Sequence, residues 1–208
     1  MNNEESAKDF FNKRALTYDR DYMGKFTQRY KQMLLEVIGE TRNVEPGCPV
    51  LDVACGTGTL LKMLYDKYSI AAYGIDISEN MINKAKEKNK NFRFDVGSAS
   101  DLHIANDNSI EVVTVSAAYH HFRDTDLFLR EAYRVLKPGG SIYIAEIRLP
   151  GLLRLLANFF AGSRFNRSGG EKMYSTNEIN ESFAKNSFVP QPSRVKNFIQ
   201  ICYAIKPV

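Results

Sequence analysis

The amino-acid sequence predicts a doubly wound α/β sandwich, in which helices cover both faces of a mostly parallel, seven-stranded sheet. Short apolar runs alternate with segments of helical periodicity, which is typical of strands buried on both faces. A glycine turn joins the first of these runs to a helix. With 208 residues, 44% of them hydrophobic, the chain is long enough for one domain with a sizeable core.

The first half of the chain establishes this alternation after a helical opening. Residues 1–45 are predicted to form a helical cap, because Tyr30, Leu34 and Ile38 recur at helical spacing. Strands are predicted at residues 50–54 and 70–75, and each is followed by a helix. Ser78 is the expected N-cap of the second of these helices. A third strand is expected at residues 92–96 and a fourth at 110–115.

The second half completes the sheet and adds a segment that breaks the pattern. A helix at residues 127–136 is expected to end at 137–140, before a fifth strand at 142–147. Residues 148–174 hold an apolar helical stripe and a loop rich in Gly, Ser and Arg. A capping box at 175–178 begins the last helix, and residues 189–199 and 201–205 are predicted to pair as strands. The single domain thus comprises a helical cap (1–45), an α/β core (46–147), an insertion or lid (148–174) and a C-terminal helix and strand pair (175–208).

Charge and cysteine content disfavour several classes of protein. The net charge of +4 is small, so the composition does not indicate a nucleic-acid partner. The three cysteines form no Cys-x-x-Cys pair, which favours a reducing, cytoplasmic location. His120 and His121 are adjacent and suit chelation badly, so no metal site is predicted. No apolar segment approaches the roughly 20 residues of a membrane span, and the acidic N-terminus is unlike a signal peptide.

The charge excess lies in residues 148–174. This segment contains Arg148, Arg154, Arg164, Arg167 and Lys172 against Glu171, and 5 − 1 gives +4. Its apolar stripe at 152–160 is open to three interpretations: core or an oligomer contact, a cover over an apolar or anionic acceptor, or a peripheral contact with a membrane surface. Because the segment follows the fifth strand, it is predicted to lie at the sheet edge where ligands of open sheets bind.

The most informative segment is the turn after the first strand. Asp52 lies in that strand, and Gly56 and Gly58 bracket the turn, where small residues let the backbone approach a ligand. Asp76 ends the second strand, where an acid suits hydrogen bonds to ribose hydroxyls. Leu61 stands at the third glycine position of a dinucleotide fingerprint, and no Gly-Lys-Ser/Thr follows the turn. The pattern therefore favours a nucleoside with a cationic arm over a dinucleotide or a P-loop ligand.

These residues resemble motif I of the class I S-adenosylmethionine-dependent methyltransferases, which have a Rossmann-like fold. Four further segments match this family in order: Tyr73-Gly-Ile-Asp-Ile-Ser78, Val96-Gly-Ser-Ala-Ser-Asp-Leu102, Ala118-Tyr-His-His-Phe122 and Glu131-Ala-Tyr-Arg-Val-Leu-Lys-Pro-Gly-Gly140. The last two segments, together with residues 10–19, are similar to the group that contains quinone-biosynthesis and other small-molecule methyltransferases. The resemblance covers about residues 8–147.

The resemblance implies S-adenosylmethionine as cofactor and S-adenosylhomocysteine as its product. Asp52, Gly56 and Gly58 would contact the methionine arm, and Asp76 would bind the ribose. The other implied contacts are Ile77, Met81, Ser98 and Ala99 around the adenine, Ser116 beneath the sulfonium, Tyr18 closing over it, and Ala54 and Thr57 in the glycine turn. Two positions depart from the family pattern: Ala54 replaces a glycine, and Ser98 replaces an acid whose contact Asp101 could supply.

Methyl transfer requires little acid–base catalysis from the protein, because a sulfonium methyl is already activated. The rate depends mainly on positioning the nucleophile and shielding the site. His120 and His121 are the candidate catalytic residues: one of them is a general base or orients the acceptor, unless both simply begin a helix. Neither Asn-Pro-Pro-Tyr nor Asp-Pro-Pro-Tyr follows the fourth strand, which disfavours amino groups of bases and glutamine as acceptors. The prediction is methyl transfer to a small molecule by a monomer or homodimer. A cofactor-binding protein without activity and an RNA methyltransferase are the alternatives.

Overall fold

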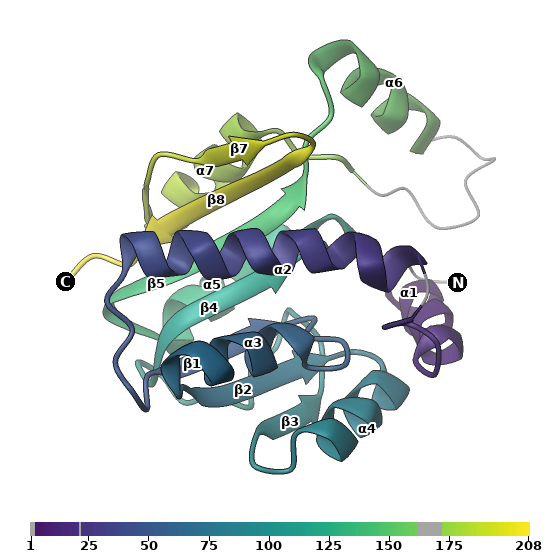
Figure 1. Ribbon diagram of the computed structural model, residues 1–208. Coiled ribbons are helices and arrows are strands. Elements are labelled where there is room, and N and C mark those ends of the chain that lie inside the picture. Colours follow the sequence, from purple (N-terminus) through teal and green to yellow (C-terminus); the bar gives the residue numbers. More distant parts are fainter. Residues whose placement is uncertain (1–2, 21, 162–171) are drawn as a thin grey trace.

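The computed structural model describes residues 3–20, 22–161 and 172–208, and one mixed sheet runs through its centre (Figure 1). The strand order is β3-β2-β1-β4-β5-β8-β6, and β7 also pairs with β8. The strands are β1 (Pro49–Val53), β2 (Ala71–Asp76), β3 (Arg93–Val96), β4 (Ile110–Ser116), β5 (Leu136–Ile147), β6 (Val189–Pro190), β7 (Arg194–Lys196) and β8 (Ile199–Ile205).

The first five strands are parallel, and β8 runs antiparallel to β5. β1 lies between β2 and β4, so the chain builds outward to β3 and then returns past β1 to β4. Connections leave β1 and β4 in opposite directions at this reversal, which is where doubly wound sheets bind ligands. The predicted doubly wound α/β fold is confirmed, and this topology already locates the site.

The far edge of the sheet differs from the seven strands predicted, because the structure has eight. β6 and β7 both pair with β8 on the side away from β5, one after the other along its length. Together they occupy the place of a single seventh strand. Pro190 and Pro192 explain the division, since proline cannot donate to a strand ladder. The turn into β8 comes at Asn197, whose φ is +55°, rather than at residue 200.

Helices cover both faces of the sheet, as predicted. On one face α2, α3 and α4 pack with residues such as Leu34, Leu61 and Ile82, and on the other α5 and α7 pack with Phe128 and Phe183. These residues are all fully buried. The helices are α1 (Asn3–Arg14), α2 (Tyr22–Thr41), α3 (Thr59–Tyr68), α4 (Glu79–Lys88), α5 (Thr125–Val135), α6 (Gly151–Ala161) and α7 (Thr176–Lys185), with one 3-10 turn, η1 (Tyr119–His121).

Local sequence signals fix the starts of some of the helices. Ser78 caps α4 by accepting a hydrogen bond from Met81 N, and Ser175 with Glu178 forms the predicted capping box of α7. The end of α5 differs from the prediction: the helix stops at Val135, and residues 137–140 already belong to β5. The chain continues there as a strand with a register shift between Ile110 and Val112 of its partner β4.

Beyond β5, helix α6 stands away from the sheet and the other helices (Figure 1). Arg164, Arg167 and Glu171 of the basic segment lie outside the described residues, whereas Arg148, Arg154 and Lys172 lie within them. No helix in the described ranges combines the length and apolarity required to cross a bilayer.

Candidate functional site

A cavity opens at the carboxyl edge of the sheet, at the reversal between β1 and β4. Its empty volume is about 770 Å³, and part of this space is open to solvent. Loops after β1, β2, β3 and β4 line it, together with side chains of the N-terminal segment. The lining residues are Phe11, Tyr18, Ala54, Gly56, Asp76, Ile77, Met81, Gly97, Ser98, Ala99, Ser100, Ser116, Ala117, Ala118, His121, Phe122 and Arg123.

The glycine turn after β1 supplies the backbone floor of the cavity. Ala54, Gly56 and Gly58 all have positive φ, at 57°, 54° and 75°. A Cβ on Gly56 would meet no protein atom within 4 Å, so this residue faces open space at the cavity. A Cβ on Gly58 would lie 2.8 Å from Phe94 Cζ, so that glycine instead allows the close packing of helix and strand. The two glycines of one motif therefore serve different purposes.

Asp76 lies in the cavity wall at the end of β2, and backbone groups hold its carboxylate. Gly56 N donates to Asp76 Oδ2 and Ser78 N donates to Asp76 Oδ1, each at 2.8 Å. Burial raises the pKa of Asp76, while these two hydrogen bonds oppose the rise. Each carboxylate oxygen can accept a further hydrogen bond, so the group is fixed and still able to receive hydroxyl donors from a ligand.

Asp52 and Lys31 are two further buried charged side chains, and they interact electrostatically. Thr114 Oγ1 donates to Asp52 Oδ1 at 2.7 Å, and the carboxyl is 2% exposed. Burial raises the pKa of Asp52 to about 7, with Thr114 and the ammonium of Lys31 opposing the rise. Burial lowers the pKa of Lys31, against the field of Asp52. Asp52 is not a lining residue of the cavity.

Of the other residues predicted to contact the cofactor, some line the cavity and some do not. Ile77, Met81, Ser98 and Ala99 line the cavity together, as the predicted adenine contacts would have to. Thr57 and Gly58 do not line it. Asp101, the expected substitute for an acid at Ser98, is not among the lining residues and lies 3.5 Å from His103 Nδ1.

The N-terminal segment is anchored across the cavity mouth. Asn12 accepts a hydrogen bond from Ser78 Oγ at 2.7 Å through its side chain, and its carbonyl accepts one from Asn80 Nδ2 at 3.1 Å. Farther along, Asp19 accepts a hydrogen bond from Thr57 Oγ1 at 2.7 Å and pairs with Lys88. These contacts tie α1 and the following loop to the motif I turn and to α4. Phe11 directly precedes the first anchor and Tyr18 directly precedes the second, so both are held against the cavity that they line.

The end of β4 brings a hydroxyl and two imidazoles to the site. Ser116 Oγ is buried and, within the described part of the chain, has no hydrogen-bond partner. His121 lines the cavity, and its ring packs edge-on against Phe11 with centroids 5.6 Å apart. His120 does not line it: His120 Nδ1 lies 2.8 Å from Glu146 Oε2. The two histidines thus have different surroundings.

Glu146 holds this segment from the neighbouring strand. Its Oε1 accepts a hydrogen bond from Tyr119 N at 2.7 Å while Oε2 bonds His120, and the residue is 2% exposed. A buried carboxylate on Nδ1 fixes the orientation of an imidazole and favours a proton on that nitrogen. His120 therefore carries the geometry of an oriented acid–base group.

Comparison with known proteins decides the family. The family described as "Methyltransferase domain" matches residues 44–200, which is most of the chain. This chain belongs to that family. The motifs described above are those of the class I S-adenosylmethionine-dependent type. A crystal structure of an S-adenosylmethionine-dependent methyltransferase from Aquifex aeolicus shares the fold. Its TM-score is 0.65 at 21% identity, and the match covers 86% of this chain and 98% of that one.

Two curated relatives are similar over part of this methyltransferase domain. A demethylmenaquinone methyltransferase of Renibacterium salmoninarum is 33% identical over 135 residues, 65% of this chain and 54% of its own length. Phosphoethanolamine N-methyltransferase 1 of Arabidopsis thaliana is 33% identical over 111 residues, 51% of this chain and 22% of its own. The chain thus spans about half of the first relative and about a fifth of the second.

Several site residues of the methyltransferase domain escape sequence reasoning. Asn12, Asp19 and Lys31 act through contacts with residues far along the chain. Residues 10–19 resemble the small-molecule group as a segment, but the resemblance assigns no contact to these three side chains. Glu146 is the exception. It is the only acid in the apolar run at 142–147, and a carboxylate in a buried strand needs partners. That signal was available in the sequence.

Proposed function

We propose that the methyltransferase domain transfers a methyl group from S-adenosylmethionine to a small molecule. The observation that carries the proposal is the convergence of the Gly56 backbone and the fixed carboxylate of Asp76 on one cavity at the sheet reversal. Fixed acceptors for ribose hydroxyls beside a glycine turn suit a nucleoside ligand.

The residues at the cavity fit this cofactor. Asp76 would bind the ribose hydroxyls, Gly56 leaves room for close approach, and the orphaned Ser116 Oγ would gain a partner. Apolar and small side chains, those of Ile77, Met81, Ser98 and Ala99, would enclose the adenine. Ala54, Asp52, Thr57 and Gly58 would shape and support the methionine arm, with Tyr18 closing over it. The bound cofactor supplies an activated methyl group on a sulfonium centre.

The protein's own contribution is to orient the acceptor and to take its proton where one must leave. His120, held at Nδ1 by Glu146, does not itself line the cavity, so its other ring nitrogen would act as the general base through a bridging water. His121 lines the cavity and would orient the acceptor. Anchoring of the N-terminal segment by Asn12 and Asp19 would keep water from the reacting groups.

The acceptor class we propose is a small apolar or anionic molecule. Phe11 and Phe122 line the cavity next to Arg123, so an apolar body and an anionic group could both be received. The names of the two relatives cover both chemistries, a quinone and a phosphate ester. A cytoplasmic location, and a monomer or homodimer, remain predictions from the sequence.

Labelled methyl transfer tests the proposal. The protein is incubated with S-adenosylmethionine carrying an isotopically labelled methyl group and with small-molecule extracts, and labelled products are counted. Gly56→Ala should abolish labelling, because its new Cβ enters the space that the cofactor needs. Gly47→Ala is the matched control: Gly47 also has positive φ, at 82°, has no atom within 4 Å of the new Cβ and does not line the cavity.

Three outcomes separate the hypotheses. Labelling by wild type and Gly47→Ala, but not Gly56→Ala, supports a methyltransferase that uses this cavity. Cofactor binding without labelling in any extract supports the alternative, a binding protein without activity. Labelling confined to added RNA would replace the small-molecule acceptor with an RNA, and its affinity would fall steeply with salt.

A further inference from the structure

Helix α6 carries an apolar face whose side chains are largely exposed to solvent. The five side chains of this face, called the α6 face below, are 48% to 75% exposed, whereas single exposed apolar residues are ordinary on protein surfaces. They are Leu152, Leu153, Leu155, Leu156 and Phe159. Five such residues on a helix of 11 residues form a contiguous patch, and contiguous patches mark contact sites.

The polar side chains of α6 point the opposite way, toward the protein. Arg154 Nη1 lies 2.6 Å from Glu178 Oε2 at the start of α7. Asn158 donates to Met173 O at 3.1 Å and accepts from Met173 N at 2.7 Å. The helix is therefore amphipathic in the reverse of the usual sense, in which the apolar face packs on the core.

The Arg154 contact is stable over a wide pH range. Burial opposes ionisation of Glu178, but hydrogen bonds from Ser175 and the charge of Lys172 lower its pKa to about 2. The Glu178 carboxylate therefore stays ionised, and able to pair with Arg154, throughout the physiological pH range.

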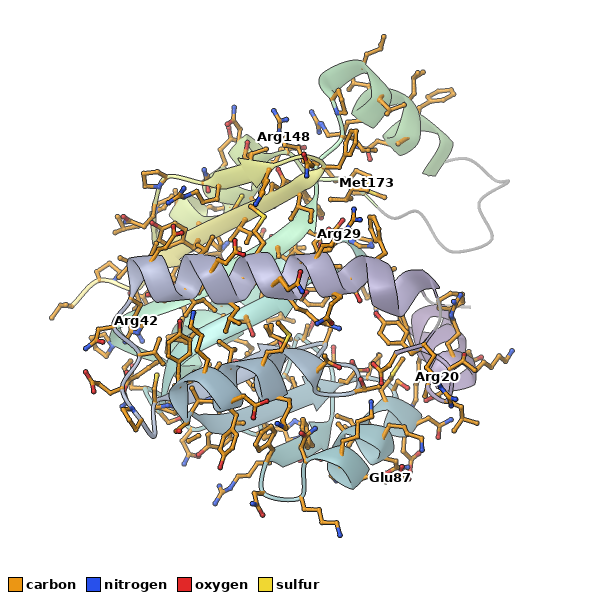
Figure 2. The ribbon with its side chains drawn as sticks, in the orientation of Figure 1. Arg20, Arg29, Arg42, Glu87, Arg148 and Met173 are labelled. Carbon is orange, nitrogen blue, oxygen red and sulfur yellow. The ribbon has the colours of Figure 1, made fainter. Side chains whose placement is uncertain are left out.

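Positive charge and one more aromatic ring border the α6 face. Arg148, which precedes α6 and is labelled in Figure 2, is exposed, and its backbone N donates to Phe198 O at 2.8 Å. This bond brings the β7–β8 turn next to the start of α6, with Phe198 60% exposed and Lys196 exposed. No acidic residue occurs between positions 147 and 161. An apolar centre with a cationic border complements an anionic, amphiphilic surface.

We propose that the α6 face docks on an anionic lipid surface. Leu and Phe on one side of a helix, with Arg and Lys at its border, match helices that lie in the plane of a membrane interface. The helix is about 16 Å long, far too short to span a bilayer. A second copy of the chain is the less favoured occupant, because one side of so short a helix is small against the about 800 Å² per subunit that stable interfaces bury.

The inference is independent of the proposed function, since docking needs neither cofactor nor acceptor. If both hold, the domain would meet an amphiphilic acceptor at the membrane, because α6 follows β5 at the carboxyl edge that also carries the cavity. Vesicle binding is measured without cofactor, so a failure of docking says nothing about methyl transfer and the reverse also holds.

Vesicle flotation tests the docking. Full-length protein is floated with vesicles of phosphatidylglycerol and, separately, of phosphatidylcholine. The variant Leu152→Ser/Leu156→Ser/Phe159→Ser should lower binding to phosphatidylglycerol vesicles by roughly tenfold or more, because interfacial binding scales with buried apolar area. Tyr65→Ser/Val189→Ser, which removes exposed apolar side chains from α3 and β6, should bind as wild type. Arg148→Gln/Lys196→Gln should weaken binding to the anionic vesicles only.

A fluorescence measurement checks the orientation of the helix. The chain has no Trp, so Phe159→Trp introduces a single reporter on the α6 face. Its emission should shift to the blue with phosphatidylglycerol vesicles and be quenched by brominated lipid, whereas Tyr65→Trp should show neither change.

Three results would overturn the proposal. The first is no flotation of wild type with either lipid. The second is equal flotation of the triple serine variant, with an unchanged Phe159→Trp spectrum. The third is a concentration-dependent dimer in sedimentation that the triple variant abolishes while lipid has no effect, which would make a second copy the occupant. Circular dichroism of each variant confirms that it folds, as expected for changes at exposed positions.

Discussion

Charged side chains are usually exposed and large apolar side chains usually buried. The glycine turn and the adjacent end of β2 depart from this rule by burying carboxylates, whereas helix α6 departs from it by exposing leucines. At the turn, the carboxylates of Asp52 and Asp76 are 2% and 7% exposed. At α6, Leu152 and Phe159 are each 75% exposed, while Arg154 faces the protein. Burying carboxylates and exposing leucines both cost free energy in an isolated domain.

The two regions also differ in how their polar groups are held. Asp76 is bound by backbone N–H groups of two loops, so its position follows from the fold itself. Helix α6 is held by side chains, an Arg–Glu pair and an Asn–backbone pair. Backbone contacts give the precision that a small-ligand site needs, whereas a surface contact tolerates the looser fixation of α6. The predictions below test this difference.

The largest effect is expected at Asp52 and depends on pH. Folding raises the pKa of this carboxyl from an ordinary 3.8 to about 7. Ionised Asp52 therefore costs nothing below the unfolded pKa, costs progressively more as pH rises, and reaches its full cost above about 7. Asp52→Asn should raise the free energy of unfolding at pH 8 by up to about 4 kcal/mol and by less at pH 5.

Urea unfolding of wild type and variant at both pH values measures this effect. Asp66→Asn, at an exposed carboxylate on α3, is the control and should change little at either pH. A gap between wild type and Asp52→Asn that is the same at pH 5 and pH 8 would mean that burial does not govern this carboxyl.

The next effect is expected at the oriented imidazole. His120→Gln should lower kcat by roughly 100-fold, as loss of a general base does, and leave cofactor affinity nearly unchanged. Glu146→Gln should lower kcat by about tenfold, because Glu146 positions His120 through the contact with its Nδ1.

His103→Gln is the matched control for this pair, since His103 is exposed and forms ion pairs with the surface acids Asp95 and Asp101. It should retain wild-type turnover. Full activity in His120→Gln would return this histidine to the simpler interpretation, a residue that begins a turn.

The smallest effect on stability is expected at Arg154. The Arg154 and Glu178 side chains are 21% and 30% exposed, so Arg154→Gln should cost less than about 1 kcal/mol. The same substitution should loosen α6 itself, so that backbone amides at residues 151–161 exchange faster and the protein floats less with vesicles. Lys62→Gln, which breaks an exposed pair with Asp66, should change neither. Unaltered exchange in α6 would show that the Arg–Glu pair does not orient the helix.

Much of the fold followed from local sequence signals. Four of the five parallel strands correspond to apolar runs, and β3 corresponds to the alternation at 92–96. The starts of α4 and α7 correspond to Ser78 and Ser175. The sequence-based predictions were wrong where contacts with neighbouring strands determine the local structure. Residues 137–140 look like a helix end but continue β5 through contacts with β4, and two prolines divide the last edge of the sheet.

Site residues were predictable from the sequence where they stand at the end of a predicted strand, because the strand then fixes where they lie. Gly56, Asp76, Ser98 and Ser116 end strands or begin loops at the same sheet edge, so topology alone brings them together. Asn12, Asp19 and Lys31 reach the site through long-range contacts that no spacing reveals. The direction of α6 was equally hidden, because its stripe fits a buried and an exposed face alike until Arg154 and Asn158 find their partners.

Titration calorimetry with S-adenosylhomocysteine tests the central claim, that Asp76 makes this cavity a cofactor site. Wild type and the control Asp66→Asn should bind with the same affinity. Asp76→Asn should bind about 10- to 100-fold more weakly, since a hydrogen bond to a charged group contributes about 1.5–3 kcal/mol. No binding by wild type, or equal binding by wild type and Asp76→Asn, would contradict the account.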